Sequence, residues 1–363
     1  QQLDQEGLRR RLASPRGIDF SGNDYLGLSR HPAVIEAVAR TVQDIGVGAG
    51  AARLVTGNHP LHEAAEEKLA GFKGTAASLI FGSGYLANLG VLSSLVGRND
   101  TVVADEAIHA SLLDGIVLSR ARLLRYRHLD LAHLAERLAA LPEDGGRWVV
   151  TETVFSMDGD FAPLAEIVAL AKRHRATVLG DEAHATGLFG PRGRGWAEAC
   201  GVEDALPCQV GTLGKALGVM GGYVACDLDT RDFLLNRARS FIYTTAPPPL
   251  LSAALVAALE VLATEGDRLR ARLFHNVRLF EQLLGPALPA GRRTLPAPGP
   301  IFPLLLGDPG KAMAAATALE AKGLIVKAIR PPTVPEGTSR LRVVIHAQHE
   351  ETEMEQLATA LQK

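Results

Sequence analysis

The chain has 363 residues and a mass of 38.5 kDa, which is enough for one large domain and a smaller one. Hydrophobic residues make up 47% and charged residues 21%, as in ordinary globular proteins, and this excludes a disordered or collagen-like chain. The net charge of -2 argues against a nucleic-acid binder, because such proteins usually carry a basic excess.

Three features of the composition predict a cytoplasmic protein. The chain opens without a basic segment followed by an apolar one, so no secretory leader is expected. The most apolar stretch, residues 250–263, contains Glu260 and is shorter than a membrane span. The three cysteines are odd in number and lack the spacing of metal ligands, which indicates a reducing compartment and no metal site.

Short apolar runs recur along the first two-thirds of the chain and predict strands. They are continuous rather than alternating, which is typical of strands buried on both faces of a sheet. They comprise residues 78–81, 101–104, 148–151, 177–180 and 222–225. Apolar residues at helical spacing separate them, for example after Pro60, Asp130 and Pro163. This order predicts an α/β fold with a mostly parallel sheet flanked by helices.

A proline-rich segment, residues 245–249, marks the predicted end of the large domain. We assign residues 1–30 to an N-terminal segment, 31–250 to the large domain and 251–363 to a small C-terminal α+β domain. The small domain is predicted to contain a long helical stretch, strand material at 290–303, a helix at 312–322, strands at 324–329 and 340–345, and a final helix.

Polar residues follow several of these strands, where open parallel sheets place their ligands. Asp181 ends one strand and His184 follows it by three residues, while Lys215 lies in a glycine-rich turn after another. Residues 82–84 form a glycine turn between a strand and a helix start. A lysine amine, a buried carboxylate and a helix N-terminus are what pyridoxal phosphate (PLP) requires. They provide its Schiff base, keep its ring nitrogen protonated and bind its phosphate.

Each of these features has a simpler interpretation when it is taken alone. Lys215 could be an exposed loop lysine, and the glycines at 82–84 could serve the shape of the turn only. His109 could be a structural histidine. The sequence Asp-Glu-Ala-His from Asp181 also occurs in helicases, but no G-x-x-x-x-G-K-[ST] loop precedes it, which disfavours an ATPase. The predicted PLP site therefore depends on the co-occurrence of these features.

Six motifs resemble those of the α-oxoamine synthases, a branch of the fold-type I PLP enzymes. The resemblance runs from about Asp19 to the C-terminus, and its motifs are Asn23–Leu28, Arg53–His62, Phe155–Asp160, Asp181–His184, Thr212–Lys215 and Ala328–Pro335. The last motif, with Arg-Pro-Pro-Thr-Val-Pro, resembles the pimeloyl-specific branch. The resemblance implies a homodimeric acyltransferase with its active site at the subunit interface. Its substrates would be L-alanine and a pimeloyl thioester of coenzyme A or of an acyl carrier protein, in biotin biosynthesis.

The resemblance assigns catalytic roles to four residues. Lys215 corresponds to the Schiff-base lysine and Asp181 to the partner of the pyridine nitrogen. His184 corresponds to the residue that binds the phenolic oxygen of the ring. His109 corresponds to the imidazole that stacks on the ring face.

The resemblance also implies the contacts of the phosphate group. The backbone amides of Gly84 and Tyr85 and the hydroxyl of Thr212 are expected to bind it. Thr244 or Thr245 is expected to add a hydroxyl from the second subunit.

Further contacts are implied for the cofactor and the substrates. Ser156 is expected to contact the cofactor through its hydroxyl. Arg330 corresponds to the arginine that binds the substrate carboxylate, and Thr333 to a nearby contact. Asn23 and Arg9 are expected to contact substrate, although the run of arginines that begins at Arg9 could also be a solvated helix face.

Other reactions share the same chemistry or the same fold. Sister enzymes join glycine to acetyl-CoA (2-amino-3-ketobutyrate CoA ligase), glycine to succinyl-CoA (5-aminolevulinate synthase) or serine to a fatty acyl thioester (serine palmitoyltransferase). An aminotransferase or a β-eliminating lyase would need no thioester. A non-enzymatic relative would form no Schiff base.

Overall fold

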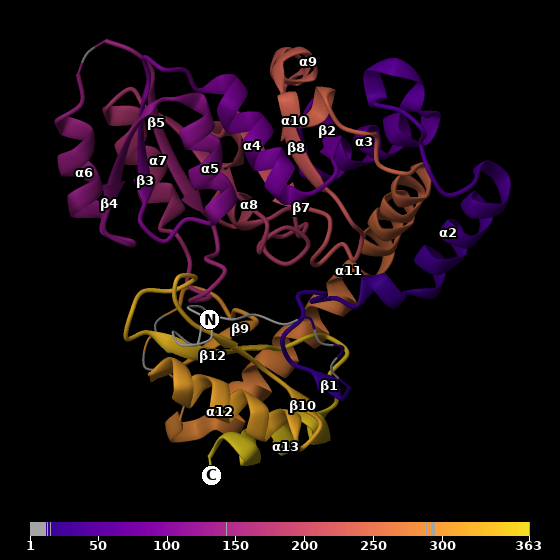
Figure 1. The fold of residues 1–363 in the computed structure, drawn as a ribbon, viewed down its shortest axis with the longest axis vertical. Coiled ribbons are helices and arrows are strands. Elements are labelled where there is room, and N and C mark those ends of the chain that lie inside the picture. Colours follow the sequence, from indigo (N-terminus) through magenta and orange to yellow (C-terminus); the bar gives the residue numbers. More distant parts are fainter. Residues whose placement is uncertain are drawn as a thin grey trace, which may run out of the picture. The chain divides into compact units, whose positions relative to one another are not determined.

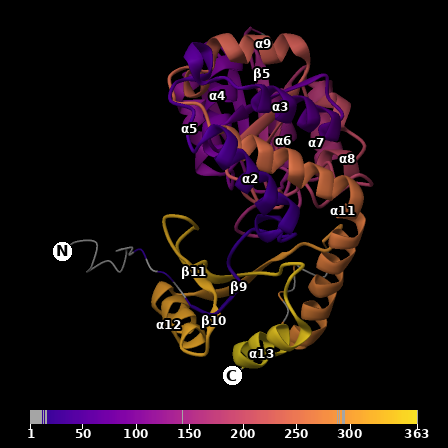
Figure 2. The ribbon, with the colours of Figure 1, turned by 90° about the vertical axis from the view of Figure 1, so that its right-hand side faces the viewer.

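The structure is a computed structural model that describes residues 12, 14, 16–142, 144–287, 289, 291 and 295–362. It contains two compact units (Figure 1). The larger unit comprises Gly27–Phe155 and Phe161–Asp267. The smaller unit comprises the described residues up to Leu26, Ser156–Asp160 and those from Arg268 onward. This division differs from the predicted boundary at residue 250, because helix α11 (Pro249–Leu284) continues unbroken past it (Figure 2).

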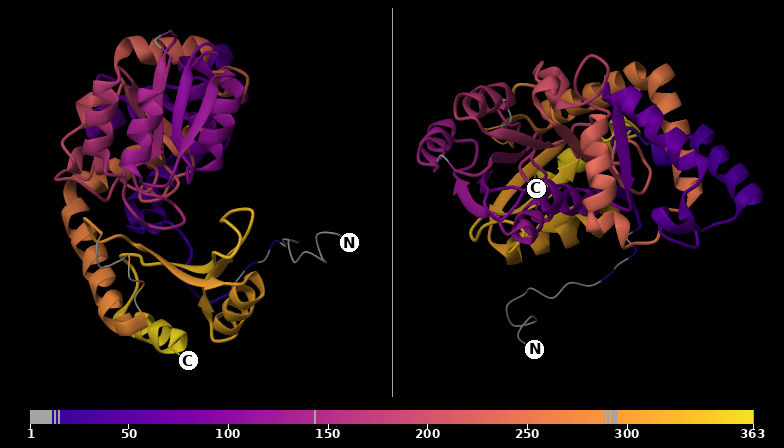
Figure 3. Two further views of the ribbon diagram at one scale, coloured as in Figure 1. Left: turned by 90° about the vertical axis from the view of Figure 1, so that its left-hand side faces the viewer. Right: turned by 90° about the horizontal axis from the view of Figure 1, so that it is seen from above.

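A sheet forms the centre of the larger unit (Figure 3, left). It has seven strands in the order β2-β8-β7-β6-β5-β3-β4. The strands are β2 (Ala77–Phe81), β3 (Thr101–Asp105), β4 (Arg122–Tyr126), β5 (Arg147–Glu152), β6 (Thr177–Asp181), β7 (Cys208–Thr212) and β8 (Gly222–Cys226). Strands β3 to β7 run parallel, and β8 runs antiparallel to both β2 and β7. Strand β2 therefore points the same way as β7, so all strands except β8 end at one edge. The predicted mostly parallel sheet is confirmed.

Helices flank this sheet, as the sequence predicts. In the larger unit they are α2 (Pro32–Ile45), α3 (Pro60–Lys73), α4 (Gly84–Leu95), α5 (Ala110–Ser119), α6 (Leu131–Ala139), α7 (Leu164–Arg173), α8 (Trp196–Ala199), α9 (Leu228–Arg237), α10 (Arg239–Ile242) and the first part of α11. Consecutive residues such as Val102 and Val103 in β3 are both fully buried, so both faces of the sheet are covered. Asp130 caps α6 as predicted, since its side chain accepts the N–H of His133 at 2.9 Å.

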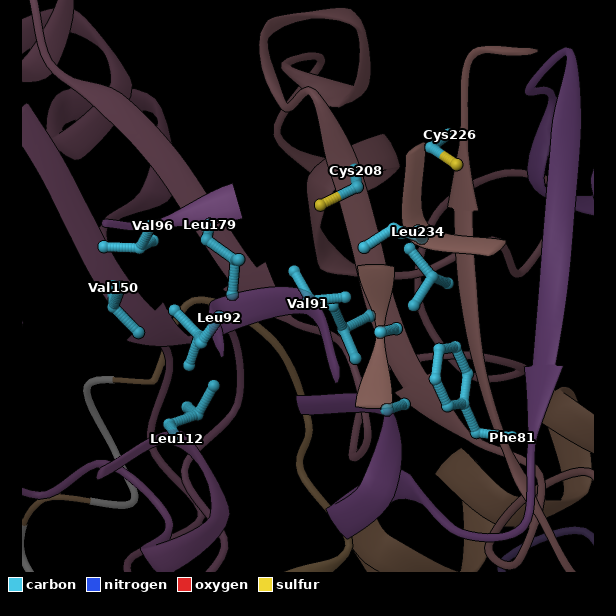
Figure 4. Packing of buried hydrophobic residues seen from close by; sticks show 14 of the residues in the cluster. Phe81, Val91, Leu92, Val96, Leu112, Val150, Leu179, Cys208, Cys226 and Leu234 are labelled. Atoms are coloured by element: carbon cyan, nitrogen blue, oxygen red, sulfur yellow. The ribbon is translucent and has the colours of Figure 1, made fainter. Parts of the chain in front are cut away.

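Helices α4 and α5 are held against one face of the sheet by a common apolar core (Figure 4). Val91 and Leu92 of α4 and Leu112 of α5 are fully buried in this cluster. Burying a side chain of this size contributes roughly 1.5–3 kcal/mol. The two helices approach closely at Gly115, where an added Cβ would lie 2.9 Å from the Leu92 side chain. This packing fixes the N-termini of both helices next to the strand ends.

The smaller unit is α+β, as predicted. Its antiparallel sheet has the order β11-β12-β9, and a short strand near the N-terminus pairs in parallel with β10. Its elements are β1 (Ile18–Asp19), the second part of α11, β9 (Ile301–Gly307), α12 (Pro309–Glu320), β10 (Leu324–Ile325), β11 (Lys327–Ile329), β12 (Ser339–Val344) and α13 (Glu351–Leu361).

The prediction of strand material at residues 290–303 is largely wrong. Among the described residues of that range, only the last three belong to a strand, β9. Pro296, Pro298 and Pro300 precede it, and a proline has no N–H to donate to a sheet. Apolar residues interrupted by prolines at alternate positions do not extend a strand.

The helical segment Pro249–Ala287 is, among the described residues, long and apolar enough to cross a membrane by length and composition. The sequence estimate of a short stretch at 250–263 differs because the helix continues beyond it. Inside the protein, 61% of the most apolar window is buried. That degree of burial is typical of the core helix of a globular fold.

Candidate active site

Polar side chains from several strand ends gather at the carboxyl edge of the seven-stranded sheet. Asp181 is the last residue of β6, and His184 lies in the turn that follows; both are buried. Lys215 lies in the turn after β7 and is half-buried. His109 follows β3 and caps α5. Parallel sheets bind their ligands at this edge.

Lys215 and His184 are joined directly. The Nζ atom of Lys215 lies 2.8 Å from Nε2 of His184. A protonated amine has no lone pair, so in that form it donates and the imidazole accepts. The turn that carries Lys215 ends at Gly218. Its φ of +68° favours glycine, and a Cβ added at this position would lie only 2.3 Å from the backbone N of Ser29, so no larger residue fits.

The buried carboxylate of Asp181 accepts two hydrogen bonds. One comes from the backbone N–H of Ala183 at 2.8 Å and the other from Nδ2 of Asn88 at 2.7 Å. An ionised carboxylate only accepts, so both donors match its charged form. Sequence reasoning missed Asn88, although a polar residue in the apolar run Leu86-Ala-Asn-Leu was a usable signal.

His109 belongs to the same hydrogen-bonded group. Its Nδ1 lies 2.7 Å from Oγ of Ser111, which in turn accepts from Nδ2 of Asn88 at 2.9 Å. Burial lowers the pKa of His109; the charge of Asp181 raises it and that of Lys215 lowers it. The pKa of His109 is lowered overall, and its imidazole lies within electrostatic range of both charged groups.

The start of α4 offers an anion site beside these residues. Ser83 caps the helix by accepting the N–H of Leu86 at 3.2 Å. The first backbone N–H groups of a helix have no partner within it and favour negative charge. An added Cβ at Gly84 would lie 3.1 Å from Cβ of Thr212, so the Thr212 hydroxyl adjoins the helix start.

The side chain of Tyr85 does not belong to this anion site. It is exposed, and its hydroxyl donates to the carboxylate of Asp114. That hydrogen bond raises the pKa of Tyr85. Only the backbone N–H of Tyr85, at the second position of α4, is available for the predicted contact.

Four of the predicted residues lie in the smaller unit. Arg342, which sequence reasoning missed, contacts two of them. Its Nε donates to the backbone oxygen of Ser156 at 2.6 Å and its Nη2 to Oδ1 of Asn23 at 3.1 Å. Arg330 is half-buried, and its backbone oxygen accepts the N–H of Thr333 at 3.1 Å. The usable signal for Arg342 was an arginine between the apolar residues Leu341 and Val343 of a predicted strand.

Thr244 and Thr245 lie in the larger unit, between α10 and α11. Their segment is anchored by a hydrogen bond of 2.8 Å between Nε2 of the buried His62 and the backbone oxygen of Pro247. The predicted substrate contact Arg9 lies outside the described residues.

Comparison with known proteins identifies the family. The model of aminotransferases of class I and II matches residues 15–361. The chain belongs to the class I and II aminotransferase family. The relative named 8-amino-7-oxononanoate synthase from Anaeromyxobacter dehalogenans (strain 2CP-1) is 47% identical, over 99% of this chain and 92% of its own length.

Solved structures of two kinds resemble this member of the aminotransferase family. The 8-amino-7-oxononanoate synthase from Francisella tularensis is 30% identical with a TM-score of 0.79, over 95% of this chain and 96% of that one. A serine palmitoyltransferase variant from S. paucimobilis, with PLP and myriocin bound, is 33% identical with a TM-score of 0.91. The match covers 99% of this chain and 94% of that one. Family and neighbours together confirm the fold-type I architecture and imply a PLP cofactor.

The residues at the sheet edge fit PLP. They supply an amine for its aldehyde, a carboxylate for its ring nitrogen and helix amides for its phosphate. Oδ1 of Asn88 is buried without a partner in the described part of the chain, while Nδ2 of the same amide donates to the Asp181 carboxylate. Among the described residues, no group of three or more His, Cys, Asp or Glu side chains is arranged to hold a metal ion.

Proposed function

We propose that this chain binds PLP and condenses L-alanine with a pimeloyl thioester to give 8-amino-7-oxononanoate, carbon dioxide and the free thiol carrier, in biotin biosynthesis. The observation that carries the proposal is the convergence of Lys215, Asp181 and His109 at one sheet edge. Curated relatives that are 45–48% identical to this chain are named 8-amino-7-oxononanoate synthase, which selects this reaction among its sisters.

The reaction breaks three bonds and makes three. The Cα–H bond, the carbon–sulfur bond and the bond from Cα to the alanine carboxylate break, so that the thiolate and carbon dioxide leave. A bond forms between Cα of alanine and the carbonyl carbon of the thioester, a proton returns to Cα after carbon dioxide has left, and a second proton converts the thiolate to the free thiol. When bound, PLP supplies an electron-accepting ring that makes the α-proton of an attached amino acid acidic enough to remove at neutral pH.

The charged residues at the sheet edge move and hold protons. When it is not bonded to the cofactor, the amine of Lys215 would be the base that takes the α-proton of alanine, and its hydrogen bond to His184 would orient it. The carboxylate of Asp181 holds a proton on the pyridine nitrogen. His184 also binds the phenolic oxygen of the ring. His109 stabilises the negative charge that develops on the thioester oxygen.

The phosphate contacts complete the proposed cofactor site. The amides of Gly84 and Tyr85 and the hydroxyl of Thr212 bind the phosphate, and Ser156 contributes a hydroxyl to the cofactor. Gly84 leaves the space that an added side chain would close against Thr212. Helices commonly bind phosphate in this way, through several backbone N–H groups at one helix N-terminus.

A homodimer is part of the proposal, with Thr244 or Thr245 lent to the phosphate of the other subunit. Large apolar side chains are exposed on the larger unit, for example Val55 at 74%, Val117 at 64% and Tyr243 at 71%. Single exposed apolar side chains are common on protein surfaces, so the proposed homodimer rests on the family resemblance.

The acyl carrier and the compartment belong to the same proposal. We propose Arg9 as a substrate contact, and a basic segment suits both the phosphates of coenzyme A and an acidic carrier protein. The free thiols of Cys200, Cys208 and Cys226 support a cytoplasmic location.

The substrate can be tested with the purified holoprotein. We expect exchange of the α-proton with solvent deuterium for alanine at a rate about tenfold or more above glycine and serine, because a fitted methyl pocket discriminates by that amount. We also expect thiol release from pimeloyl-CoA or a pimeloyl carrier protein only when alanine is present. Mass spectrometry and a thiol reagent measure the two steps.

Two other outcomes would contradict the proposal. Exchange of serine with thiol release from a long-chain acyl-CoA would indicate a serine palmitoyltransferase. Amino transfer without thiol release would indicate an aminotransferase.

The role of Arg330 gives a second prediction. We propose that its guanidinium binds the carboxylate of alanine, with Thr333 and Asn23 as further substrate contacts, because guanidinium and carboxylate can pair through two hydrogen bonds. Arg330→Ala is expected to raise the KM for alanine roughly 30-fold, the loss of a charge-assisted bond of about 2 kcal/mol. Lys327→Ala removes an exposed cation from the same segment and should leave the KM unchanged. An unchanged KM in Arg330→Ala would move the carboxylate site elsewhere.

A further inference from the structure

The hydrogen-bonded group around His109 allows each donor and acceptor to be assigned. The carboxylate of Asp181 only accepts, so the amide of Asn88 must turn its Nδ2 toward it, at 2.7 Å. The second N–H of the same amide donates to Oγ of Ser111 at 2.9 Å. Since Oγ accepts there, its own hydrogen is available for Nδ1 of His109 at 2.7 Å.

A second contact leads to the same assignment for His109. The backbone N–H of Ser111 also points at Nδ1, at 3.2 Å. A backbone N–H is always a donor, so Nδ1 must carry a lone pair to receive it. We infer that Ser111, oriented by Asn88, is a positioning residue that holds His109 as a neutral imidazole with its hydrogen on Nε2.

The charged groups that face His109 come from three elements. Asp181 at the end of β6 and Asp114 of α5 favour the protonated imidazole, whereas Lys215 after β7 disfavours it. The carboxylate of Asp114 is already engaged by the hydroxyl of Tyr85. Burial is the largest influence and lowers the pKa of His109. Protonation of Nδ1 would also remove the lone pair that accepts the backbone N–H of Ser111, and it would reverse the hydrogen bond with Oγ of Ser111.

The inferred tautomer leaves one donor for a ligand. Nε2 of His109 has no hydrogen-bond partner within the described part of the protein, so its N–H can donate to an oxygen that becomes negatively charged. The tautomer itself follows from the contacts of the protein alone. Its consequence for catalysis depends on the function proposed above.

The tautomer can be measured without turnover. In protein with ring-labelled histidine, with and without added PLP, ¹⁵N shifts assigned by His109→Gln should show hydrogen on Nε2 and a lone pair on Nδ1. Ser111→Ala should increase the fraction protonated on Nδ1, and Ser111→Thr, which keeps the hydroxyl, should restore the original pattern. The matched control Ser119→Ala removes a buried hydroxyl from the same helix, where it bonds Ile116. Hydrogen on Nδ1 in the unmodified protein would overturn the inference, and so would an unchanged pattern in Ser111→Ala.

Kinetics test the consequence for the reaction. Ser111→Ala is expected to lower kcat about tenfold, the loss of one hydrogen bond, with the KM for alanine within about twofold. Because the lone pair on Nδ1 becomes more basic, the acid limb of the pH profile should move to higher pH. Ser111→Thr should recover both values. A normal kcat and pH profile in Ser111→Ala would overturn the positioning role. If the protein does not catalyse the proposed reaction, the kinetic test does not apply, and the NMR measurement of the His109 tautomer alone tests the inference.

Discussion

Replacing Lys215 with alanine is expected to abolish turnover and the visible absorbance of bound PLP. The amine of Lys215 is the group that can bond to the PLP aldehyde, and in the proposed reaction it is also the base. Loss of a nucleophile and a base together should reduce kcat/KM by roughly a thousand-fold or more. Absorbance spectra, PLP content and kcat/KM measure the effect.

Two controls separate this chemistry from a loss of structure. Lys68→Ala removes a lysine that pairs with Glu260 at 2.7 Å on the surface, and a pair of this kind contributes little to stability. That variant should keep the absorbance and the activity. A small primary amine added to Lys215→Ala should restore part of the proton removal. Normal turnover in Lys215→Ala would remove the proposed mechanism.

The sheet could be predicted from the sequence because its strands are buried on both faces. In a run such as Thr101–Ala104 every residue is buried, so the sequence is almost continuously apolar. This pattern differs clearly from the periodic pattern of the helices between the strands. Strand β4 was missed because it lies at the edge of the sheet, where Arg122 and Arg125 are exposed and break the apolar pattern. Edge strands carry less of the burial on which such predictions depend.

The candidate site could be predicted where a residue follows a strand end. Asp181, His184 and Lys215 each do so, and the structure places them together. Asn88 and Ser111 were missed because each is a single polar residue in an apolar helix, which marks the position as unusual but does not show which residue it contacts. These two residues matter because their hydrogen bonds connect Asp181 to His109, and the packing of α4 against α5 and the sheet brings the four side chains together.

The roles drawn from the resemblance stay predictions where no contact bears on them. The smaller unit holds Ser156 and Asn23 through Arg342, but their contacts with a cofactor or substrate follow from the resemblance alone. A sequence motif predicts the role of a residue but does not show the contacts through which the residue performs it. The Arg330 variant therefore tests the motif and not a contact seen in the structure.

Asp181→Asn is expected to retain PLP better than activity. The phosphate contacts and the bond from Lys215 do not involve Asp181, whereas the proton on the ring nitrogen depends on its charge. We expect kcat to fall by roughly a hundred-fold to a thousand-fold, since the neutral amide no longer stabilises that proton. PLP content by absorbance, compared with kcat for the same preparation, measures the difference.

A double variant distinguishes the charge of Asp181 from its hydrogen bonds. Two donors, Nδ2 of Asn88 and the N–H of Ala183, face the carboxylate. An amide in its place has one oxygen for two donors, and the unpaired donor costs about 1–3 kcal/mol of stability. Combining Asp181→Asn with Asn88→Asp restores the hydrogen bond between positions 88 and 181 with donor and acceptor exchanged, so the melting temperature should recover in part. The activity should not recover, because the negative charge then lies on α4 and no longer at the end of β6, and because position 88 no longer donates to Oγ of Ser111. Recovery of activity along with stability would mean that Asp181 acts through structure and not through the ring nitrogen.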